Sequence, residues 1–390
     1  MSNVSAENRL ASLDVFRGAT IAAMILVNNP GSWSAAYGPL KHAAWHGWTF
    51  TDLVFPFFLW IVGVAIPLSI ARRLAAGERR GDLFRHAIRR AIIIFALGFF
   101  LNSLPYLLDG SLFRDGLSAW LHSYLTTVRI PGVLQRIAVC YLVAIGIYLT
   151  AGLRAQIAWT VGLLLLYWAL MMFVPVPGFG AGVLEKEGNL SQYIDNAVLN
   201  GPIIGTHVYR SAKIYDPEGL LSTLPAIASC MFGVLTGALV RSGLNRETKT
   251  AWIFTMGALL LWIGSIMDMF FPINKNIWTS SYTVFMAGMA ATCFAVCYWL
   301  VDVQGWRKWS KPLSVYGMNA ITVFVLAGVV GRVSLEIKVG GSPLKTWLFQ
   351  NVFENIPDSK LASLSWALTY VLLLYLVAWA MYRKKWFVKF

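Results

Sequence analysis

Charged residues are scarce in this sequence. Asp, Glu, Lys and Arg make up 13% of the 390 residues, and 57% are hydrophobic, whereas soluble domains carry about a quarter charged residues. This composition excludes an ordinary soluble protein. The hydrophobic segments recur evenly from end to end, so we expect one domain over residues 1–390 rather than the two or three soluble domains that the length would suggest.

Cysteine and histidine are also few. All four cysteines lie in hydrophobic segments and none forms a Cys-x-x-Cys pair, so we expect inert core residues. His42 and His46 are four residues apart, but no third ligand follows at a motif spacing, and no metal site is predicted. Walker, GxGxxG and GxSxG motifs are absent.

Acidic residues are outnumbered, with 18 Asp and Glu against 32 Lys and Arg and a net charge of +14. In a soluble protein this excess would suggest nucleic acid as a partner. Here the basic residues gather in short loops between hydrophobic segments, which is typical of cytoplasmic loops in membrane proteins. We therefore expect a lipid bilayer as the partner and no nucleic acid.

Ten segments are long and hydrophobic enough to cross a bilayer as helices of about 20 residues. The distribution of Lys and Arg favours cytoplasmic termini. The sequence therefore predicts an all-α, polytopic membrane protein. The predicted spans lie near 12–30, 51–71, 88–108, 133–151, 157–175, 221–241, 251–271, 281–301, 313–333 and 364–382.

The segment 40–63 combines two histidines with a carboxylate at the mouth of the second predicted span. Asp52 is costly at that depth unless it has a partner, so it is a functional candidate. Pro56 has no N–H for the carbonyl of Asp52, which leaves that backbone free to bend or bind. Trp45 is equally compatible with the membrane interface and with stacking on a sugar.

Polar residues at the ends of other predicted spans are candidates for an anionic ligand. Arg17 shares a helix face with Asp14, either as a paired, snorkelling side chain or as a ligand. The Arg-rich loop before the third span anchors the topology or receives a phosphorylated molecule, and Arg89 and Arg90 are its best-placed members.

The fourth and ninth predicted spans also carry polar residues. Gln135 and Arg136 lie at the mouth of the fourth span, and a buried Arg there requires an anion or an acidic partner. Asn319, in the ninth, is expected to bond another helix, and Gly317 beside it permits close approach.

Two acids precede the sixth predicted span. Asp216 and Glu218 either mark the first turn of a helix or form a lip over a binding site.

Several of these segments together resemble the heparan-α-glucosaminide N-acetyltransferase family and its bacterial relatives. The matching stretches are, in chain order, SLDVFRG, KHAAWHGWTFTDLVFPFF, RIPGVLQR, YDPEGLLSTLPAI and GMNAITVF. The resemblance covers most of the predicted bundle, so the chain is expected to correspond to the family's catalytic core. The likeness to the bacterial relatives implies a location in the bacterial inner membrane.

The resemblance implies transfer of acetyl from cytosolic acetyl-CoA to the amine of a glucosamine-type sugar across the membrane. It matches His42 to the family's active-site histidine and Asp52 to its conserved acid. His46 stands where the family usually has Asn. On this basis we predict acetyl-CoA as co-substrate near Asp14, Arg17, Arg89, Arg90, Gln135, Arg136 and Asn319, and the sugar near Trp45, His46, Asp216 and Glu218.

A histidine is suited to take the proton that the attacking amine must lose. We therefore predict His42 as general base, with Asp52 orienting the imidazole. Asn28 and Asn29 are the expected donors to the carbonyl oxygen. An acetyl-histidine intermediate is an open alternative.

The pantetheine arm would have to thread the bundle, which requires a continuous cavity between the two membrane surfaces. An amino-sugar permease is the alternative function, although no internal repeat supports it. A homodimer is expected only because dimers are common.

Overall fold

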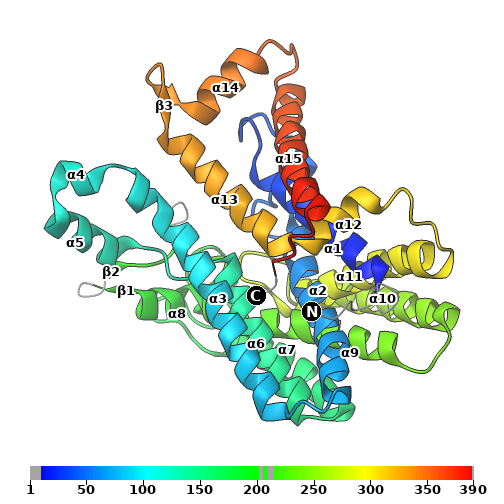
Figure 1. Ribbon diagram of the computed structural model, residues 1–390. Coiled ribbons are helices and arrows are strands. Elements are labelled where there is room, and N and C mark those ends of the chain that lie inside the picture. The colour runs from blue at the N-terminus through cyan, green and yellow to red at the C-terminus, as the bar shows by residue number, and fades with distance from the viewer. Residues whose placement is uncertain (1–9, 202–204, 210–214, 389–390) are drawn as a thin grey trace.

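The computed structural model describes residues 10–201, 205–209 and 215–388. In these ranges the chain is almost entirely helical (Figure 1). The only strands described are two short hairpins, in which β1 (Asn200–Gly201) pairs with β2 (Gly205–Thr206) and β3 (Lys338–Val339) with β4 (Ser342–Pro343). The predicted all-α class is confirmed.

Within the described ranges nine helices are long and apolar enough to cross a membrane. Each overlaps a predicted span, so the multi-pass prediction is confirmed. The helices are α1 (Ala11–Asn28), α2 (Phe50–Ala75), α3 (Arg80–Leu108), α6 (Val133–Thr150), α7 (Leu153–Phe173), α9 (Thr223–Arg241), α10 (Arg246–Asp268), α11 (Ser280–Tyr298) with its continuation η3 (Trp299–Val303), and α15 (Ser359–Arg383).

The ninth predicted span is broken, not continuous. α12 (Lys311–Met318) and α13 (Ala320–Glu336) meet at Asn319 with a bend of 79°. The side chain of Asn319 donates to the carbonyl of Trp386 at 3.0 Å and accepts from the amide of Val388 at 3.1 Å. Asn319 thus bonds the backbone that follows α15 instead of another helix, and the C-terminal segment lies beside the bend.

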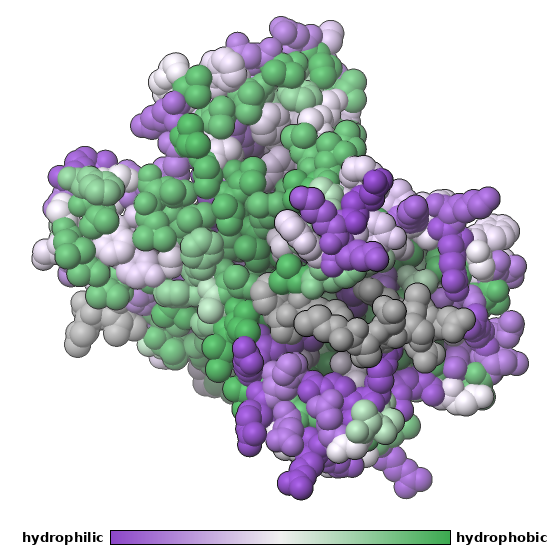
Figure 2. Space-filling model, in the orientation of Figure 1, coloured by the Kyte–Doolittle hydropathy of each residue, from purple (hydrophilic) through white to green (hydrophobic). Residues whose placement is uncertain are grey.

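The spans alternate in direction, so their connections gather at two ends of the bundle. We call one end the His42 face, which carries η2 (Gly38–Leu40), α4 (Ser111–Asp115), α5 (Leu117–Thr127), α8 (Leu190–Leu199), α14 (Leu344–Val352) and both hairpins. We call the other end the Arg17 face, where the described residues form short turns and the segment that follows α15. Figure 2 shows a broad hydrophobic patch over α3 and α13. Hydrophilic residues lie on both sides of this patch, near α14 at the top and at the lower right of the view.

Glycines allow two pairs of helices to approach closely. A Cβ at Gly63 in α2 would lie 1.9 Å from the carbonyl oxygen of Cys230 in α9. A Cβ at Gly317 in α12 would lie 2.0 Å from the carbonyl oxygen of Asp14 in α1. Any larger side chain at these crossings would force the helices apart. The predicted role of Gly317 in close packing is therefore confirmed. Of the nine helices, α2 is the most deeply buried in the bundle.

Candidate active site

The His42–Asp52 pair is built at the N-terminus of α2. Thr49 caps this helix and forms a capping box with Asp52, whose carboxylate accepts from the Thr49 amide at 3.0 Å. The same carboxylate lies 2.6 Å from Nδ1 of His42 and accepts from the Ala43 amide at 3.0 Å. Asp52 is 1% exposed and His42 is 42% exposed. A fixed, buried acid thus orients an imidazole that solvent and ligands can reach.

The gap that Pro56 leaves in α2 is filled by a second helix. The backbone carbonyl of Asp52 accepts a hydrogen bond from the Tyr282 hydroxyl of α11 at 2.6 Å. This is the carbonyl that lacks its usual helical N–H because residue 56 is proline. The contact ties the first turn of α2 to α11 and holds the backbone under the His42–Asp52 pair.

Lys275 is the closest cation to this pair. Its Nζ lies 3.2 Å and 3.3 Å from the two ring nitrogens of His42 and 3.9 Å from the Asp52 carboxylate. Burial lowers the pKa of Lys275, and the nearby carboxylates of Glu218 and Asp52 only partly reverse this effect. The turn between α10 and α11 therefore brings an ammonium group to the imidazole.

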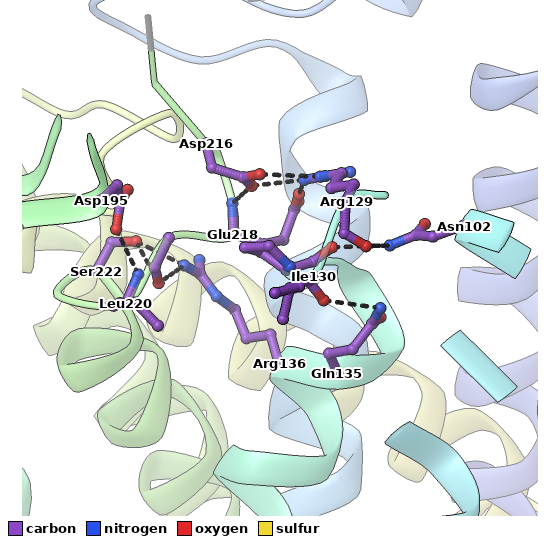
Figure 3. Close-up of polar contacts among 12 residues, drawn as sticks. Asn102, Arg129, Ile130, Gln135, Arg136, Asp195, Asp216, Glu218, Leu220 and Ser222 are labelled. Carbon is purple, nitrogen blue, oxygen red and sulfur yellow. Dashed lines mark hydrogen bonds and ion pairs between the residues drawn. The ribbon is translucent and has the colours of Figure 1, made fainter. Parts of the chain in front are cut away.

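Arg129 organises the acids that precede α9 (Figure 3). Its guanidinium pairs with both oxygens of Asp216, at 2.9 and 2.5 Å, and also with Glu218. Burial by itself raises the pKa of Glu218, but the charges of Arg129, Arg136 and Lys275 together outweigh this effect, and the pKa lies below its ordinary value. Glu218 therefore carries a negative charge at the cavity wall, whereas Asp216 is fully buried.

These groups surround a cavity of about 400 Å³, the His42 cavity. It is large enough for a small ligand, since ligand pockets span about 300–1,000 Å³. Its polar lining comes from five parts of the chain that are far apart in sequence: Asn28, His42, Arg129, Tyr209, Tyr215, Glu218, Lys275 and Asn276.

A second cavity of about 400 Å³ adjoins the first on the His42 face. We call it the Arg332 cavity. The two share Asn28, Arg129 and Tyr209 in their walls, with Met24 and Val133. Asn29 and Gln135 line only this second cavity, and the Asn29 amide already donates to the Ile25 carbonyl at 2.8 Å.

A third cavity, of about 410 Å³, opens near the Arg17 face. Arg17, His86, Arg90 and Asn319 line it. Arg17 pairs with the buried Asp14 at 3.1 Å, and Nε of Arg90 is buried without a hydrogen-bond partner among the described residues. The cavity is thus basic and carries an unsatisfied donor, a combination that suits a phosphate group.

The predicted continuous cavity is wrong for this structure. Between the two faces lies a narrow apolar void with no room for a water molecule. On one side, Phe58 and Ile321 line this constriction and also the cavity near the Arg17 face. On the other side, Met24 and Phe324 line the constriction and also the Arg332 cavity. The cause is side-chain size: hydrophobic residues from four helices meet at the bundle centre and close the passage.

Seven predicted site residues line none of these three cavities. Three of them, Asp14, Asp52 and Asp216, form ion pairs with residues that do, whereas the other four do not. Arg136 is buried, bonds Gly219 and Ser222, and stacks on Trp278 (Figure 3 shows its bonds). Arg89 is exposed on α3.

The other two are Trp45 and His46. Trp45 is buried behind Tyr215, with its ring centroid 5.1 Å from the tyrosine's, while His46 points to Glu185 at 3.7 Å. The structure does not bring any of these four side chains to a cavity surface.

Comparison with known proteins shows that the chain is similar to two acetyltransferases. No family model matches it. It is 29% identical to the heparan-α-glucosaminide N-acetyltransferases of Homo sapiens and Mus musculus, over 98% and 99% of its own length. The chain is a distant relative of these enzymes. It spans about 60% of the length of each, and the resemblance inferred from the motifs is confirmed.

For a distant relative of these acetyltransferases, the most informative residues that sequence reasoning missed are Lys275 and Arg129 as site members. Lys275 lies in the short connection between α10 and α11, on the face where few Lys and Arg are expected. A basic residue at such a position is the sequence signal that could have identified it as a site residue. Arg129 lies at the mouth of the fourth predicted span, seven residues before Arg136, but only Arg136 was predicted to bind a ligand. Arg332 and Lys345 were missed because nothing local in the sequence places them at a cavity.

Proposed function

We propose that this protein transfers the acetyl group of acetyl-CoA to the amine of a glucosamine-type sugar in the His42 cavity. The observation that carries the proposal is the 2.6 Å contact between His42 and the buried Asp52 in the wall of a ligand-sized cavity. The relationship to two N-acetyltransferases supports the reaction type. An imidazole held by a carboxylate is the arrangement that general-base catalysis requires.

In the proposed reaction the Nδ1–H group of His42 donates a hydrogen bond to the Asp52 carboxylate, and Nε2 carries the lone pair that accepts a proton. The sugar nitrogen attacks the thioester carbonyl carbon and gives its proton to Nε2. The C–S bond then breaks, and the CoA thiolate leaves with the proton that His42 returns. Asp52 stabilises the imidazolium between these two steps.

The carbonyl oxygen gains negative charge during the attack, and fixed donors there lower the barrier. Lys275 and Asn28 are the donors in the wall of the His42 cavity, and Lys275 already contacts the imidazole at 3.3 Å. Asn29 is the weaker candidate because its amide donates to its own helix. We therefore assign this stabilisation to Lys275 and Asn28.

We place the phosphates of acetyl-CoA in the basic cavity near the Arg17 face, with Arg17 and Arg90 as ligands. The unsatisfied Nε of Arg90 and the adjacent His86 support this assignment. The pantetheine arm then has to pass the apolar constriction, so Phe58 and Met24 must move when the co-substrate binds. We further propose that the Arg17 face is cytoplasmic, in a bacterial inner membrane, because its loops are rich in Arg.

The test is acetyl-CoA turnover by the purified protein in lipid nanodiscs. With glucosamine as acceptor we expect free CoA and N-acetylglucosamine, detected by a thiol reagent and by mass spectrometry. His42→Ala is expected to reduce turnover by about 10²–10⁴-fold. His122→Ala, an exposed histidine of α5, is the matched control. Wild-type turnover in His42→Ala would remove the general base from the mechanism.

An amino-sugar permease is the second candidate. Cavities near both faces, with a constriction between them, offer a sugar an approach from either side of the membrane. Counterflow of labelled sugar in proteoliposomes without acetyl-CoA would favour this function over the transferase. No counterflow, together with CoA release, would exclude it.

A further inference from the structure

The turn between α10 and α11 holds Trp278 in a strained backbone conformation. Its φ is 49°, in the left-handed region that bulky residues rarely adopt. Among the described residues other than glycine, Lys385 is the one further case of positive φ. The Trp278 side chain is fully buried. Packing of a core aromatic does not require such a backbone, and strain of this kind persists only where the surrounding structure enforces it, most often near functional sites.

The backbone at Trp278 closes the turn that presents Lys275. The amide of Trp278 donates to the carbonyl of Lys275 at 3.1 Å. Next to this bond, the Thr279 amide donates to the Asn274 carbonyl at 3.0 Å. In return, the Asn274 amide donates to the Thr279 hydroxyl at 3.0 Å. Lys275 thus extends from a closed loop, residues 274–279, whose shape depends on the conformation of Trp278.

Four helices fix the Trp278 ring. Its Nε1 donates to the Ser229 hydroxyl of α9 at 3.1 Å. Phe55 of α2 and Tyr282 of α11 meet the ring edge to face, with centroids 5.0 and 5.2 Å away. The guanidinium of Arg136, on α6, lies over the ring at 5.1 Å from its centroid. The ring therefore cannot turn without displacing side chains of all four helices.

Arg136 links this turn to the segment that precedes α9. It is buried, and its Nη2 donates to the Gly219 carbonyl at 2.8 Å and to the Ser222 hydroxyl at 2.5 Å (Figure 3). Its Nε and Nη1 are buried without a hydrogen-bond partner among the described residues. The guanidinium rests on the face of Trp278, and a desolvated cation is strongly attracted to such a face. The two side chains therefore hold each other in place.

Lys275 is the part of this arrangement that reaches the candidate active site. Its Nζ lies 3.2 Å from Nδ1 and 3.3 Å from Nε2 of His42, and 3.9 Å from the Asp52 carboxylate. The lysine side chain is flexible, so the position of its backbone decides whether the ammonium group stays at the imidazole. A displacement of about 1 Å at a group of this kind can lower a rate about 10²-fold.

We propose that Trp278, together with Arg136, is a positioning residue for acetyl transfer. The pair holds the turn before α11 in the conformation that places Lys275 against His42. This inference rests on the proposed function, because it assigns a role within that same site. Trp278 contacts Phe55, which lines the His42 cavity, but Trp278 does not line the cavity itself. It therefore acts on the reaction through Lys275 and not by contact with the substrates.

The first experiment measures the placement of Lys275 without turnover. The purified protein in nanodiscs is treated briefly with an N-hydroxysuccinimide ester of propionic acid, and propionylation of Lys275 is measured by peptide mass spectrometry. The exposed Lys338 is the internal reference. The Lys275 side chain is 14% exposed. We expect Trp278→Phe or Arg136→Gln to raise its labelling rate about tenfold, because a loosened turn exposes the amine.

Trp60→Phe is the matched control. Trp60 of α2 is also buried, but it packs on Phe16 and Phe294, so the same exchange disturbs the core without reaching the turn. Lys275 should be labelled in this variant as in the wild type. An equal rise in Trp60→Phe and Trp278→Phe would overturn the inference.

The inference also fails if Lys275 labelling stays unchanged in folded Trp278→Phe and Arg136→Gln. Size-exclusion chromatography shows whether each variant is folded. If either is not, Ser229→Ala takes its place, because it removes only the hydrogen bond to the Trp278 ring. The same rise in Lys275 labelling is then expected, and its absence counts against the inference in the same way.

The second experiment asks whether Trp278 acts through Lys275. With glucosamine as acceptor, we expect Trp278→Phe to lower kcat roughly tenfold and to leave KM for both substrates unchanged. Lys275→Met removes the amine and is expected to lower kcat about 10²–10³-fold. In that background, Trp278→Phe should change kcat by no more than about twofold. If the two losses multiply instead, Trp278 does not act through Lys275 and the inference is wrong.

The two experiments distinguish this inference from the proposed function. If the wild type acetylates no acceptor while Lys275 labelling still depends on Trp278, the proposed function fails and the placement of Lys275 by Trp278 stands. If acceptors are acetylated but neither labelling nor kcat responds to Trp278→Phe, the proposed function stands and the inference fails.

Discussion

At the scale of single residues, Asp52 has a structural role in capping α2 in addition to its proposed role beside His42. Asp52 accepts hydrogen bonds from two backbone amides and one hydroxyl in addition to its contact with His42. A buried carboxylate with this many donors remains charged and fixed. Asp52 therefore caps the N-terminus of α2 and also orients the proposed base. We expect its loss to affect both stability and turnover.

Asp52→Asn separates these two effects. The amide keeps the size and one acceptor, but it does not stabilise an imidazolium. We expect kcat to fall by about 10²–10⁴-fold with little change in KM for glucosamine. Steady-state CoA release by the purified variant checks this. A loss of the folded protein on size-exclusion chromatography would instead show that the capping role dominates, and an unchanged kcat would exclude the orienting role.

Asp195 of α8 predicts a pH-dependent stability. Burial, together with the charge of Asp216, raises its pKa from 3.8 to about 7, and the Leu220 amide only partly opposes this. A carboxyl group with a raised folded-state pKa stabilises the fold while protonated. Its contribution is complete below about pH 4 and is lost as pH rises through about 7.

Asp195→Asn removes this penalty. We expect the thermal unfolding midpoint of the variant to exceed that of the wild type at pH 8 by at least about 2 °C, and the difference to shrink at pH 5. Differential scanning fluorimetry in detergent measures both midpoints. Glu187→Gln changes an exposed carboxylate just before α8 and should show no such trend. A pH-independent difference for Asp195→Asn would contradict the assignment.

At the scale of helices, close crossings hold the site together. α2 carries Asp52 at one end and crosses α9 at Gly63, where the two backbones touch. α9 follows directly after the acids that pair with Arg129. Separation of α2 from α9 would therefore move the proposed base away from Glu218.

Gly63→Ala tests this packing. The added methyl group would meet the Cys230 carbonyl oxygen at 1.9 Å, so we expect a loss of about 1–3 kcal/mol in stability and lower turnover. Gly162→Ala, at a helical position of α7 where a Cβ meets no other atom within 4 Å, is the control and should stabilise slightly. Thermal unfolding in detergent measures both. Equal stability of the two variants would show that the crossing is not tight.

At the scale of the whole molecule, the two faces differ in kind. The His42 face carries the short helices, both hairpins and two cavities, while the Arg17 face carries short turns and a basic cavity. The proposed reaction needs a co-substrate from one face and an acceptor from the other. An apolar constriction separates the cavities of the two faces. Transfer across it therefore requires the pantetheine arm of the co-substrate to displace the apolar side chains that close it.

Cysteine accessibility tests the proposed orientation. Ser34→Cys places an exposed thiol on the His42 face, and Gly243→Cys places one in the turn between α9 and α10 on the Arg17 face. In right-side-out membrane vesicles we expect an impermeant maleimide to label Ser34→Cys and to spare Gly243→Cys until detergent is added. The wild type, whose four cysteines are buried or partly buried, gives the background. The reverse labelling pattern would invert the topology.

The sequence alone determined the class of this protein and most of its elements. Runs of about 20 hydrophobic residues cross a bilayer whatever lies beside them, so the spans followed from local pattern. The resemblance and the choice of Asp52 as a candidate also rested on local sequence. The break at Asn319 did not, because it depends on bonds to the backbone of Trp386 and Val388 far along the chain.

Only the tertiary structure decided which polar residues share a cavity. Lys275 reaches His42, and Arg129 pairs with Asp216, through contacts that span 233 and 87 positions. Arg136, an equally promising side chain by sequence, is turned into the core against Trp278. The physical reason is that hydrophobicity sets which segments enter the membrane, whereas the rotation and tilt of each helix, which aim its few polar side chains, are set by packing against its neighbours.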